Sequence, residues 1–436
     1  MSNKKKVMIK TYGCQMNEYD SERMLRDLQE LDFSKTDDQK EADLVLLNTC
    51  HIREKAAEKV YSELGRIKTL KEKNKNLKIG VTGCVAQAES TEIFKRQPAV
   101  DFIIGPQAYH KFPKIIKDLE KGKKKLIETS FEAKEKFKKL KEEREEKRSS
   151  AFLTIQEGCD KFCTFCVVPY TRGKEVSREK ADIMTEAQIL VKANVKELTL
   201  LGQNVNSYCS NGNSLANLIE SLSEIDGLER IRFMTSHPKD MSEDLISVFG
   251  TNKKLMPFLH LPVQSGSDKI LKLMNRKHTI EEYKEIIFKL RNVRKDICFS
   301  SDFIVGFPGE TEKDFRETIN LCQSIEFSQA YSFNYSSRPG TPASKRLEVE
   351  DSKKKERLYQ LQEVLEVQQK TFLRRELGKT VKVLFEKRGK DSNEYIGRSD
   401  YFYPVSVQSE YEIIGKIRDV KIELCLKHSV RGSLID

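Results

Sequence analysis

Three cysteines crowd into one short loop of this chain, Gly158-Cys159-Asp160-Lys161-Phe162-Cys163-Thr164-Phe165-Cys166. Three residues separate the first two cysteines, and two residues separate the last two. This spacing is typical of thiolates that bind three irons of an iron–sulfur cube and leave the fourth iron open to another ligand. A structural zinc site would use a fourth Cys or His nearby, and neither residue occurs again before Cys209. The spacing favours an iron–sulfur cluster, while a zinc site completed by a distant ligand stays open.

Strand-like and helical segments alternate after this loop and directly before it. Runs typical of buried strands occupy residues 152–157, 197–201, 230–236, 258–263, 300–306 and 330–335. Segments with helical periodicity lie between them, for example 183–191, 283–293 and 315–325. Six repeats of strand and helix predict an α/β domain over 151–377, a partial open barrel with the cysteine loop after its first strand.

Three earlier cysteines each end a hydrophobic run. Cys14, Cys50 and Cys84 follow residues 7–13, 43–49 and 79–83, and they lie 36 and 34 residues apart, the length of one strand–helix repeat. The strands of a parallel α/β sheet all point the same way, so these cysteines are expected at one edge, where open sheets build their sites. One such cysteine would indicate packing. Three in equivalent positions predict a second three-thiolate site, suited to another four-iron cluster with an open iron where a sulfur species binds.

Composition limits the class of protein. A chain of 436 residues with 38% hydrophobic residues predicts two or three packed domains. We expect neither a signal peptide nor a membrane span, and ten cysteines without an export signal indicate the reducing cytoplasm. The net charge of +11 fits a polyanionic partner. It is weak evidence for nucleic acid, because much of the surplus lies in one Lys-rich segment.

That segment, residues 121–150, is dominated by Lys, Glu and Arg, which predicts a solvated helix or mobile linker between a domain at 1–120 and the barrel. Residues 351–377 predict a long charged helix, and short alternating strands predict a small β-barrel at 378–436. Within it, residues 395–404 combine Arg398 with aromatic residues such as Tyr401 and Tyr403. These side chains suit base stacking and phosphate contacts in RNA. A tyrosine-rich hairpin packed on its own barrel is the equally open alternative.

The cysteine loop, with the aromatic Phe165 before its last cysteine, resembles the signature of the radical S-adenosylmethionine (SAM) enzymes. The whole chain is similar to the methylthiotransferases of that superfamily, which have an amino-terminal cluster domain, a radical SAM barrel and a carboxyl-terminal TRAM domain. Residues 48–61, 170–178 and 274–276 resemble the branch that modifies isopentenyladenosine beside the tRNA anticodon. Two features depart from the branch: the linker is unusually rich in Lys and Glu, and His51 stands where a smaller polar residue is common.

The resemblance implies a tRNA methylthiotransferase with SAM and two 4Fe–4S clusters as cofactors. The cluster ligands would be two sets, Cys14, Cys50 and Cys84, and Cys159, Cys163 and Cys166. Carbon 2 of adenine bears a hydrogen too weakly acidic for an ordinary side-chain base at neutral pH, so a radical route is needed. In the family's scheme, one SAM methylates a sulfur at the amino-terminal cluster. Another SAM, cleaved at the barrel cluster, yields a deoxyadenosyl radical that activates the adenosine.

Strand-end position gives the residues that we expect to bind SAM. They are Phe165, Gly202, Gln203, Asn204 and Gln264. The cysteines outside the two sets are expected to be packing or surface thiols. They are Cys209, Cys298, Cys322 and Cys425.

The implied partner is the anticodon arm of a tRNA that carries isopentenyladenosine at position 37. We also expect a flavodoxin-like or ferredoxin-like electron donor, a sulfur donor, a monomeric enzyme and no membrane partner. Sister enzymes that act on threonylcarbamoyladenosine in tRNA, or on a ribosomal protein, would share both cysteine sets. In a different class, a non-catalytic RNA-binding zinc protein would use the cysteines structurally, and its anaerobically purified form would be colourless and contain zinc.

Overall fold

The computed structural model describes residues 4–50, 54–138 and 148–435. The chain forms two compact units. The first unit comprises Met1–Lys141, Glu157–Phe162 and Cys166–Arg178, and the second comprises Glu142–Gln156, Cys163–Phe165 and Glu179–Asp436. The cysteine loop is therefore divided, because its first and last cysteines belong to the first unit and its middle one to the second.

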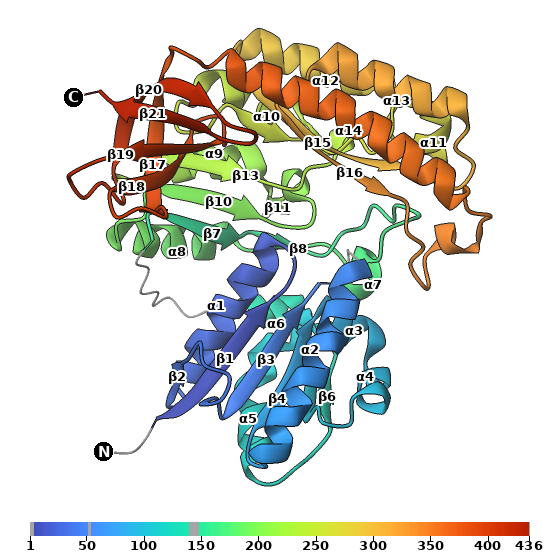
Figure 1. Cartoon of the computed structure of the whole chain (residues 1–436), viewed down its shortest axis with the longest axis vertical. Coiled ribbons are helices and arrows are strands. Elements are labelled where there is room, and N and C mark those ends of the chain that lie inside the picture. Colours follow the sequence, from blue (N-terminus) through green and yellow to red (C-terminus); the bar gives the residue numbers. More distant parts are fainter. Residues whose placement is uncertain (1–3, 51–53, 139–147, 436) are drawn as a thin grey trace. The chain divides into compact units, whose positions relative to one another are not determined.

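A parallel six-stranded sheet forms the centre of the first unit, in the order β2-β1-β3-β4-β5-β6 (Figure 1). Its strands are β1 (Lys5–Thr11), β2 (Phe33–Lys35), β3 (Leu44–Thr49), β4 (Lys78–Gly83), β5 (Phe102–Ile104) and β6 (Leu126–Glu128). The helices of this unit are α1 (Gln15–Gln29), α2 (Glu54–Lys73), α3 (Cys84–Glu89), α4 (Thr91–Arg96), η1 (Pro106–Lys111), α5 (Phe112–Glu120), α6 (Ala133–Lys138) and α7 (Val168–Arg172). The predicted parallel α/β sheet is confirmed.

Strand β3 shows how this sheet is buried. Leu44 and Leu46 pack in one hydrophobic cluster with α1 and α5, whereas Val45 and Leu47 pack in another with α2 and α3. Successive side chains of a strand point to opposite faces, so helices cover both faces of the sheet. Both faces of an all-parallel sheet are normally covered in this way.

The charged segment predicted as a linker needs a correction in its described part. Leu126–Glu128 pairs in parallel with β5 as the sixth strand of the sheet. Farther on, Lys136 of α6 is almost fully buried, because its ammonium group forms ion pairs with Asp20 and Glu157. The interpretation of residues 121–138 as a solvated helix or mobile linker is therefore wrong, and residues 139–147 lie outside the described part.

The six predicted barrel strands all form. They are β7 (Ser150–Thr154), β10 (Glu197–Leu201), β13 (Arg230–Phe233), β14 (Phe258–His260), β15 (Cys298–Val305) and β16 (Gln329–Asn334). They make two parallel three-stranded sheets, β13-β10-β7 and β14-β15-β16. A parallel bridge between Ile231 and Leu255, just before β14, continues the first sheet toward the second. The short pieces β8 (Gln156–Glu157), β9 (Val176–Ser177), β11 (Cys209–Ser210) and β12 (Asn213–Ser214) lie outside these sheets.

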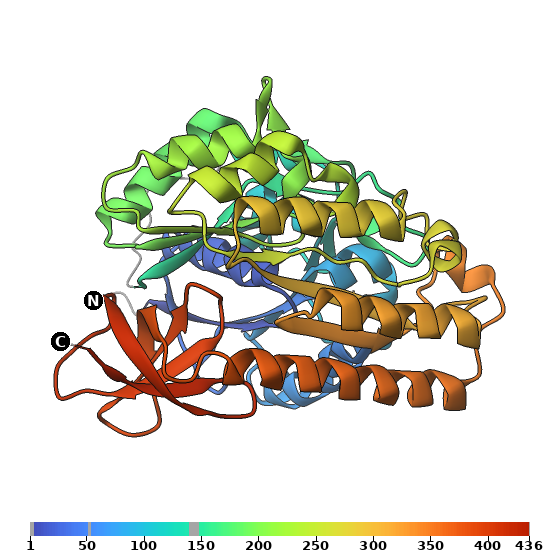
Figure 2. The ribbon, with the colours of Figure 1, turned by 90° about the horizontal axis from the view of Figure 1, so that it is seen from above.

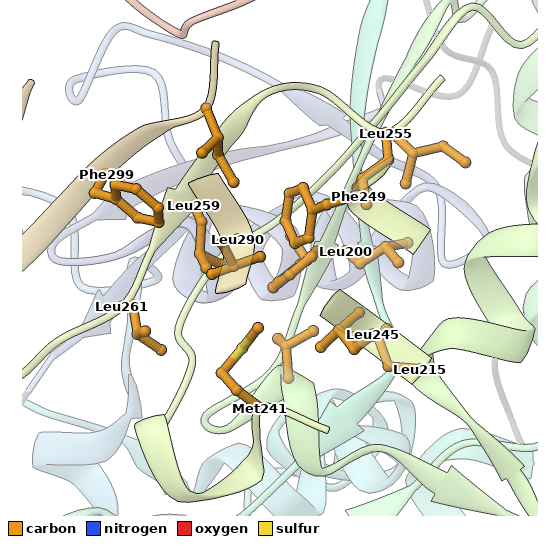
Figure 3. Close-up of a cluster of buried hydrophobic side chains, with 14 of the residues drawn as sticks. Leu200, Leu215, Met241, Leu245, Phe249, Leu255, Leu259, Leu261, Leu290 and Phe299 are labelled. Atoms are coloured by element: carbon orange, nitrogen blue, oxygen red, sulfur yellow. The ribbon is translucent and has the colours of Figure 1, made fainter. Parts of the chain in front are cut away.

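Amphipathic helices bury the outer surface of these strands. They are α8 (Lys180–Lys192), α9 (Leu215–Ser223), α10 (Glu243–Thr251), α11 (Asp268–Leu273), α12 (Ile280–Val293), α13 (Glu312–Ile325) and α14 (Asp351–Arg374), with short η2 (Val205–Ser207), η3 (Pro238–Asp240) and η4 (Pro342–Lys345). Capping boxes at Thr279 and Thr311 fix the starts of α12 and α13. Figure 3 shows Leu200 of β10 and Phe249 of α10 within the resulting core. Figure 2 shows α14 running beside α13.

The carboxyl-terminal strands close into the predicted small β-barrel, in the order β17-β18-β19-β21-β20. They are β17 (Thr380–Arg388), β18 (Glu394–Ser399), β19 (Pro404–Gln408), β20 (Ile417–Cys425) and β21 (Val430–Leu434). Two buried arginines of β13 attach this barrel within the second unit. Arg230 Nη1 donates to the carbonyl of Arg398, and Arg232 Nη2 donates to that of Ser399. None of the described helices has the length and apolarity needed to cross a membrane.

Candidate functional sites

The three amino-terminal cysteines lie at the carboxyl ends of three adjacent strands, as predicted. Cys14 caps the start of α1 after β1, Cys50 directly follows β3, and Cys84 is the first residue of α3 after β4. Because β1, β3 and β4 are neighbours in the sheet, the fold brings these distant residues to one edge. Cys50 and Cys84 are buried, and Cys14 is exposed.

Close backbone packing at this edge requires a glycine before the first cysteine. Gly13 has φ +123°, and a Cβ at this position would lie 2.3 Å from Cys50 Cβ and 3.1 Å from Cys50 Sγ. L-residues rarely adopt this backbone conformation. The approach of the Gly13–Cys14 turn to Cys50 therefore depends on the missing side chain.

Electrostatics at the edge favours the thiolate form of Cys14. The pKa of Cys14 is lowered to about 6, mainly by a hydrogen bond with the Cys50 thiol. The charge of Arg172 acts in the same direction, and desolvation opposes both. Burial disfavours the charged guanidinium of Arg172, but the negative charges of Asp20 and Cys84 help to outweigh it and raise the pKa of Arg172. The deprotonated thiol is the form that binds metals.

An asparagine beside Cys50 ties the strand ends together. Asn48 Nδ2 donates to the carbonyl of Asn17 at 2.8 Å and to Ser21 Oγ at 2.9 Å. Asn17 Nδ2 in turn donates to the carbonyl of Tyr12 at 2.8 Å. These bonds hold the first turn of α1, which Cys14 caps, against the end of β3. In the same family-like stretch, His51 lies outside the described residues.

The middle of the cysteine loop is anchored in the second unit. Thr164 donates its backbone N–H to the carbonyl of Met274 at 3.0 Å, and its own carbonyl accepts from Ala343 at 2.9 Å. Buried Arg276 donates from Nη1 to Cys163 Sγ at 3.5 Å. The sequence marks 274–276 as family-like, and the structure gives Arg276 a role that the sequence did not predict.

The first and last cysteines of the loop are held by backbone contacts inside the first unit. The Cys159 backbone N–H donates to the carbonyl of Gly173 at 3.2 Å. Cys166 Sγ accepts from the N–H of Val168, the first residue of α7, at 3.4 Å. An N–H donated to sulfur favours the thiolate that a metal ligand must become.

One glutamine organises the predicted SAM residues that follow β10. Gln156 Oε1 accepts the backbone N–H groups of Gln203 at 2.8 Å and Asn204 at 3.2 Å. A Cβ on Gly202 would lie 2.5 Å from the same oxygen, so only glycine fits there. Gln156 is a candidate site residue that sequence reasoning missed, because only its position before the cysteine loop distinguishes it.

Several buried polar atoms at the carboxyl ends of the barrel strands lack a hydrogen-bond partner among the described residues. Among the described residues, Asn204 Oδ1 after β10, Ser236 Oγ after β13 and Asn334 Oδ1 at the end of β16 have no hydrogen-bond partner. Burying such atoms unpaired is costly. A polar ligand such as SAM fits this rim.

The other two predicted SAM residues differ in how they are held. Gln264 follows β14 with φ +77°, and its backbone bonds to Asp302 and Ile304 of β15. Phe165 packs edge-on against Phe307, with ring centroids 6.5 Å apart. Its contact with SAM stays a prediction, because packing already accounts for its position.

The thiols of both cysteine sets are suitable metal ligands, but their positions in this structure are not those of a metal site. Within residues 4–50, 54–138 and 148–435, no three Cys, His, Asp or Glu side chains are arranged to hold a metal ion. The amino-terminal thiols nevertheless offer the soft donors that iron–sulfur clusters use, and a buried cation beside them offsets their charge. Cluster ligation by all six cysteines stays a prediction.

The structure favours packing over base stacking for the tyrosines of the carboxyl-terminal barrel. Tyr395 and Tyr403 are buried in its core, and Tyr403 OH donates to Glu376 at 2.9 Å. Tyr401 OH donates to Asp296 at 3.2 Å. For Tyr403, burial and this hydrogen bond favour the packed hairpin that the sequence left open. Outside the two cysteine sets, burial raises the pKa of Cys298, Cys322 and Cys425, as expected of packing thiols.

Three family models match the chain. They are "Uncharacterized protein family UPF0004" at residues 6–105, "Radical SAM superfamily" at 153–322 and "TRAM domain" at 374–435. The first covers β1 to β5 of the sheet with its cysteine edge, the second covers most of the barrel, and the third covers the closed β-barrel.

Several solved structures resemble this one in fold. A radical S-adenosylmethionine methyltransferase, TsrM from Kitasatospora setae, aligns with a TM-score of 0.61 and 12% identity over 78% of this chain and 75% of that chain. The cobalamin-dependent S-adenosylmethionine radical enzyme OxsB aligns with a TM-score of 0.52 and 14% identity over 83% of this chain and 56% of that chain. At these identities the likeness concerns the fold alone.

Relatives with known names match along the whole length. A protein of Ruegeria sp. (strain TM1040), named tRNA-2-methylthio-N(6)-dimethylallyladenosine synthase, is 54% identical over 441 residues, which is 100% of both chains. A protein of the same name from Cereibacter sphaeroides (strain ATCC 17029 / ATH 2.4.9) is 52% identical over 99% of both chains. This chain therefore belongs to the tRNA-2-methylthio-N(6)-dimethylallyladenosine synthase family of the radical SAM superfamily.

Proposed function

We propose that this chain is a tRNA methylthiotransferase that attaches a methylthio group to carbon 2 of isopentenyladenosine at tRNA position 37. The full-length identity to synthases of that name carries the proposal. Both cysteine sets support it, because the reaction needs a radical source and a sulfur source. The same likeness favours this substrate over threonylcarbamoyladenosine, a ribosomal protein, or a non-catalytic zinc role.

The two cysteine sets would hold one 4Fe–4S cluster each, and SAM would bind at the carboxyl ends of the barrel strands. When bound, the barrel cluster and SAM supply a radical that removes an unactivated hydrogen, and the amino-terminal cluster supplies the sulfur. Gln156 presents the backbone of Gln203 and Asn204 to this rim. Arg276 orients Cys163 through its hydrogen bond to the sulfur. The barrel excludes water from the site and orients the reactants.

A basic cleft in the second unit supports tRNA as the substrate. It is lined by Lys196, Lys253, Lys382, Lys416 and Arg418, together with Glu229 and Asp400. Its residues come from the amino-terminal ends of the radical SAM barrel strands and from the closed β-barrel. Lysines and arginines on such a surface neutralise phosphates. Because SAM would bind at the opposite ends of these strands, the cleft would hold tRNA phosphates away from the reacting nucleoside, with Arg398 as a further candidate contact.

The remaining parts of the proposal concern the cellular setting. A tRNA-modifying enzyme works in the cytoplasm, as a monomer in this proposal. Reductive SAM cleavage needs an electron donor, which we infer to be a flavodoxin-like or ferredoxin-like protein. Replacing sulfur after each turnover needs a sulfur donor.

Mass analysis of tRNA nucleosides from cells that lack this gene tests the proposed substrate. We expect methylthio-isopentenyladenosine to disappear and isopentenyladenosine to accumulate. Restoring the gene should reverse both changes, and a Cys159→Ala copy should not. Unchanged methylthio-isopentenyladenosine, with loss of a methylthio group elsewhere, would redirect the activity to one of the alternative substrates.

A further inference from the structure

A buried arginine reaches the amino-terminal cysteine edge from the other cysteine loop. Arg172 is the last residue of α7 and lies six residues after Cys166. Both residues belong to the first unit, as do the three cysteines of the sheet edge. The side chain of Arg172 is only 3% exposed, although an arginine is almost never buried without partners. Its position therefore needs an explanation.

The contacts of Arg172 lead directly to the cysteine edge. Its Nη2 donates to Asp20 Oδ2 at 3.0 Å and to Asn17 Oδ1 at 3.2 Å. The same Asn17 oxygen lies 3.9 Å from Cys14 Sγ. The opposite nitrogen, Nη1, lies 3.8 Å from Glu157 Oε1 and has no hydrogen-bond partner among the described residues. Nη2 of this guanidinium is thus bound to protein side chains, whereas Nη1 can still donate to a further anion.

The buried charges around Arg172 leave a positive surplus. Among the described residues, the buried cations Lys136 and Arg172 form ion pairs with two carboxylates, Asp20 and Glu157, and a third buried cation, Arg23, adjoins Lys136. Arg23 Nη2 donates to the carbonyl of Lys136 at 2.9 Å, and within the described part of the chain Arg23 forms no ion pair with a carboxylate. A buried charge without a counterion is strongly unfavourable. Negative charge at the neighbouring amino-terminal cysteine edge would offset this surplus of positive charge.

We propose that Arg172 is a positioning residue of the amino-terminal site, whose guanidinium offsets the negative charge of the cluster and sulfur held by Cys14, Cys50 and Cys84. The proposal rests on the proposed function, since it presumes a cluster at this edge. It also links the two cysteine sets through sequence, because the loop that carries Cys166 delivers this cation. A purely structural role, in which Arg172 only attaches α7 to α1 through Asp20, is the competing explanation.

Electrochemistry separates the two explanations. The full-length chain with Cys159, Cys163 and Cys166 all changed to Ala keeps only the amino-terminal cluster, so its iron content and reduction potential report on that site. Into this parent we would introduce Arg172→Gln, which removes the charge but keeps an amide donor for Asp20. Arg172→Lys keeps the charge, and Asp20→Asn removes the nearest opposing charge. Arg276→Gln removes the buried arginine beside Cys163 and is the matched control.

A nearby cation favours the more negative, reduced form of a cluster. We expect Arg172→Gln to shift the reduction equilibrium at least about tenfold toward the oxidised form, about 59 mV for a one-electron couple. Asp20→Asn should shift it in the opposite direction. Arg172→Lys and Arg276→Gln should stay close to the parent. Loss of iron from Arg172→Gln, with retention in Arg172→Lys, supports the proposal equally.

Several results would overturn the inference. Arg172→Gln could retain both iron and potential, Arg172→Lys could behave like Arg172→Gln, or Arg172→Gln and Asp20→Asn could shift the potential in the same direction. General damage to the fold gives the last of these patterns, because both variants break the same ion pair. A parent without iron would instead contradict the amino-terminal cluster of the proposed function and remove the inference with it.

Discussion

The two predicted cysteine sets would reach the same ligand chemistry by different routes. Cys159, Cys163 and Cys166 lie within eight residues of one loop, so their spacing is set by one short stretch of sequence. At the amino-terminal edge, Cys14 and Cys84 are 70 residues apart and meet only because their strands are neighbours in a parallel sheet. One loop contains all the cysteines of the first set, whereas the cysteines of the second set are brought to one edge only by the folded domain.

This difference predicts how each set fails. A short loop tolerates change in the surrounding fold, whereas a site assembled from three strand ends depends on the register and close packing of the sheet. Each set also has its own buried arginine, Arg276 beside Cys163 and Arg172 beside the sheet edge. The following experiments break or sharpen the contrast.

Removing either complete set should have the largest effect. Changing Cys159, Cys163 and Cys166 to Ala should abolish product formation and lower iron per chain to about half, because each set is proposed to hold its own cluster. Changing Cys14, Cys50 and Cys84 to Ala should do the same through the other cluster. Iron and labile sulfide in anaerobically purified protein measure both results. Complete loss of iron from either triple variant would show that the sites are not independent.

A single change at the sheet edge should separate the two half-reactions. Cys50→Ala should abolish methylthio transfer to tRNA and leave reductive SAM cleavage at the barrel. Mass spectrometry of the nucleoside and chromatography of deoxyadenosine measure the two outcomes in one reaction. Cys298→Ala, at a packing thiol, is the control that should retain both. Normal methylthio transfer by Cys50→Ala would reduce this cysteine to a packing role.

The basic cleft should affect tRNA binding without affecting either cysteine set. Lys416→Ala combined with Arg418→Ala removes two exposed charges that line it. We expect weaker tRNA binding and a salt-dependence slope smaller by roughly 0.7 to 0.9 per lost phosphate contact. Iron content should not change. Lys355→Ala, on an exposed part of α14 outside the cleft, is the matched control. An unchanged slope would remove this cleft from the tRNA surface.

Backbone packing should matter at the sheet edge more than at a helix surface. Gly13→Ala places a Cβ against Cys50 and a side chain at φ +123°, so we expect a loss of roughly 1–3 kcal/mol in the stability of the first unit and depletion of its cluster. Gly65→Ala in α2 is the control, because its Cβ would meet open space and helix propensity would improve. Denaturant unfolding and iron content measure both. Equal stability and iron content in Gly13→Ala and Gly65→Ala would contradict the close approach of Gly13 to Cys50.

Thiol reactivity gives the smallest and most local test. In iron-free protein at pH 7, Cys14 should be mostly thiolate, because its pKa is lowered to about 6, and iodoacetamide should label it readily. Labelling should slow as the pH falls through this value. Cys298 and Cys322 should stay unlabelled in folded protein, since burial raises the pKa of both. Labelling of Cys322 before Cys14 would reverse the predicted order.

Sequence reasoning reached the fold and the cysteine edge because both follow from local patterns. The hydrophobic runs before Cys14, Cys50 and Cys84 predicted three strands, and the common direction of parallel strands placed their ends at one edge. The order of neighbours β1, β3 and β4 then came from the structure. The partial barrel, the closed β-barrel and the family were likewise predicted and are confirmed.

What sequence reasoning missed depends on contacts between distant residues. Lys136 lies in a charged segment that predicts solvent exposure, yet it is buried by pairing with Asp20 and Glu157. Arg172 lies in a family-like stretch of sequence, and only the structure shows its hydrogen bond to Asn17, beside Cys14. Local sequence patterns cannot predict such pairings, because the paired residues are far apart in the chain. The predicted domain boundaries and the individual SAM contacts stay predictions.

A reconstituted reaction tests the central claim most directly. The holoenzyme, SAM and a chemical reductant would be incubated anaerobically with tRNA that carries isopentenyladenosine, tRNA that carries threonylcarbamoyladenosine, or ribosomal protein. Mass spectrometry would follow each substrate, with the two triple-cysteine variants alongside. The account predicts one methylthio group on isopentenyladenosine, none on the other substrates, and no product from either variant. A methylthio group on another substrate, or product formed without the amino-terminal cysteines, would contradict it.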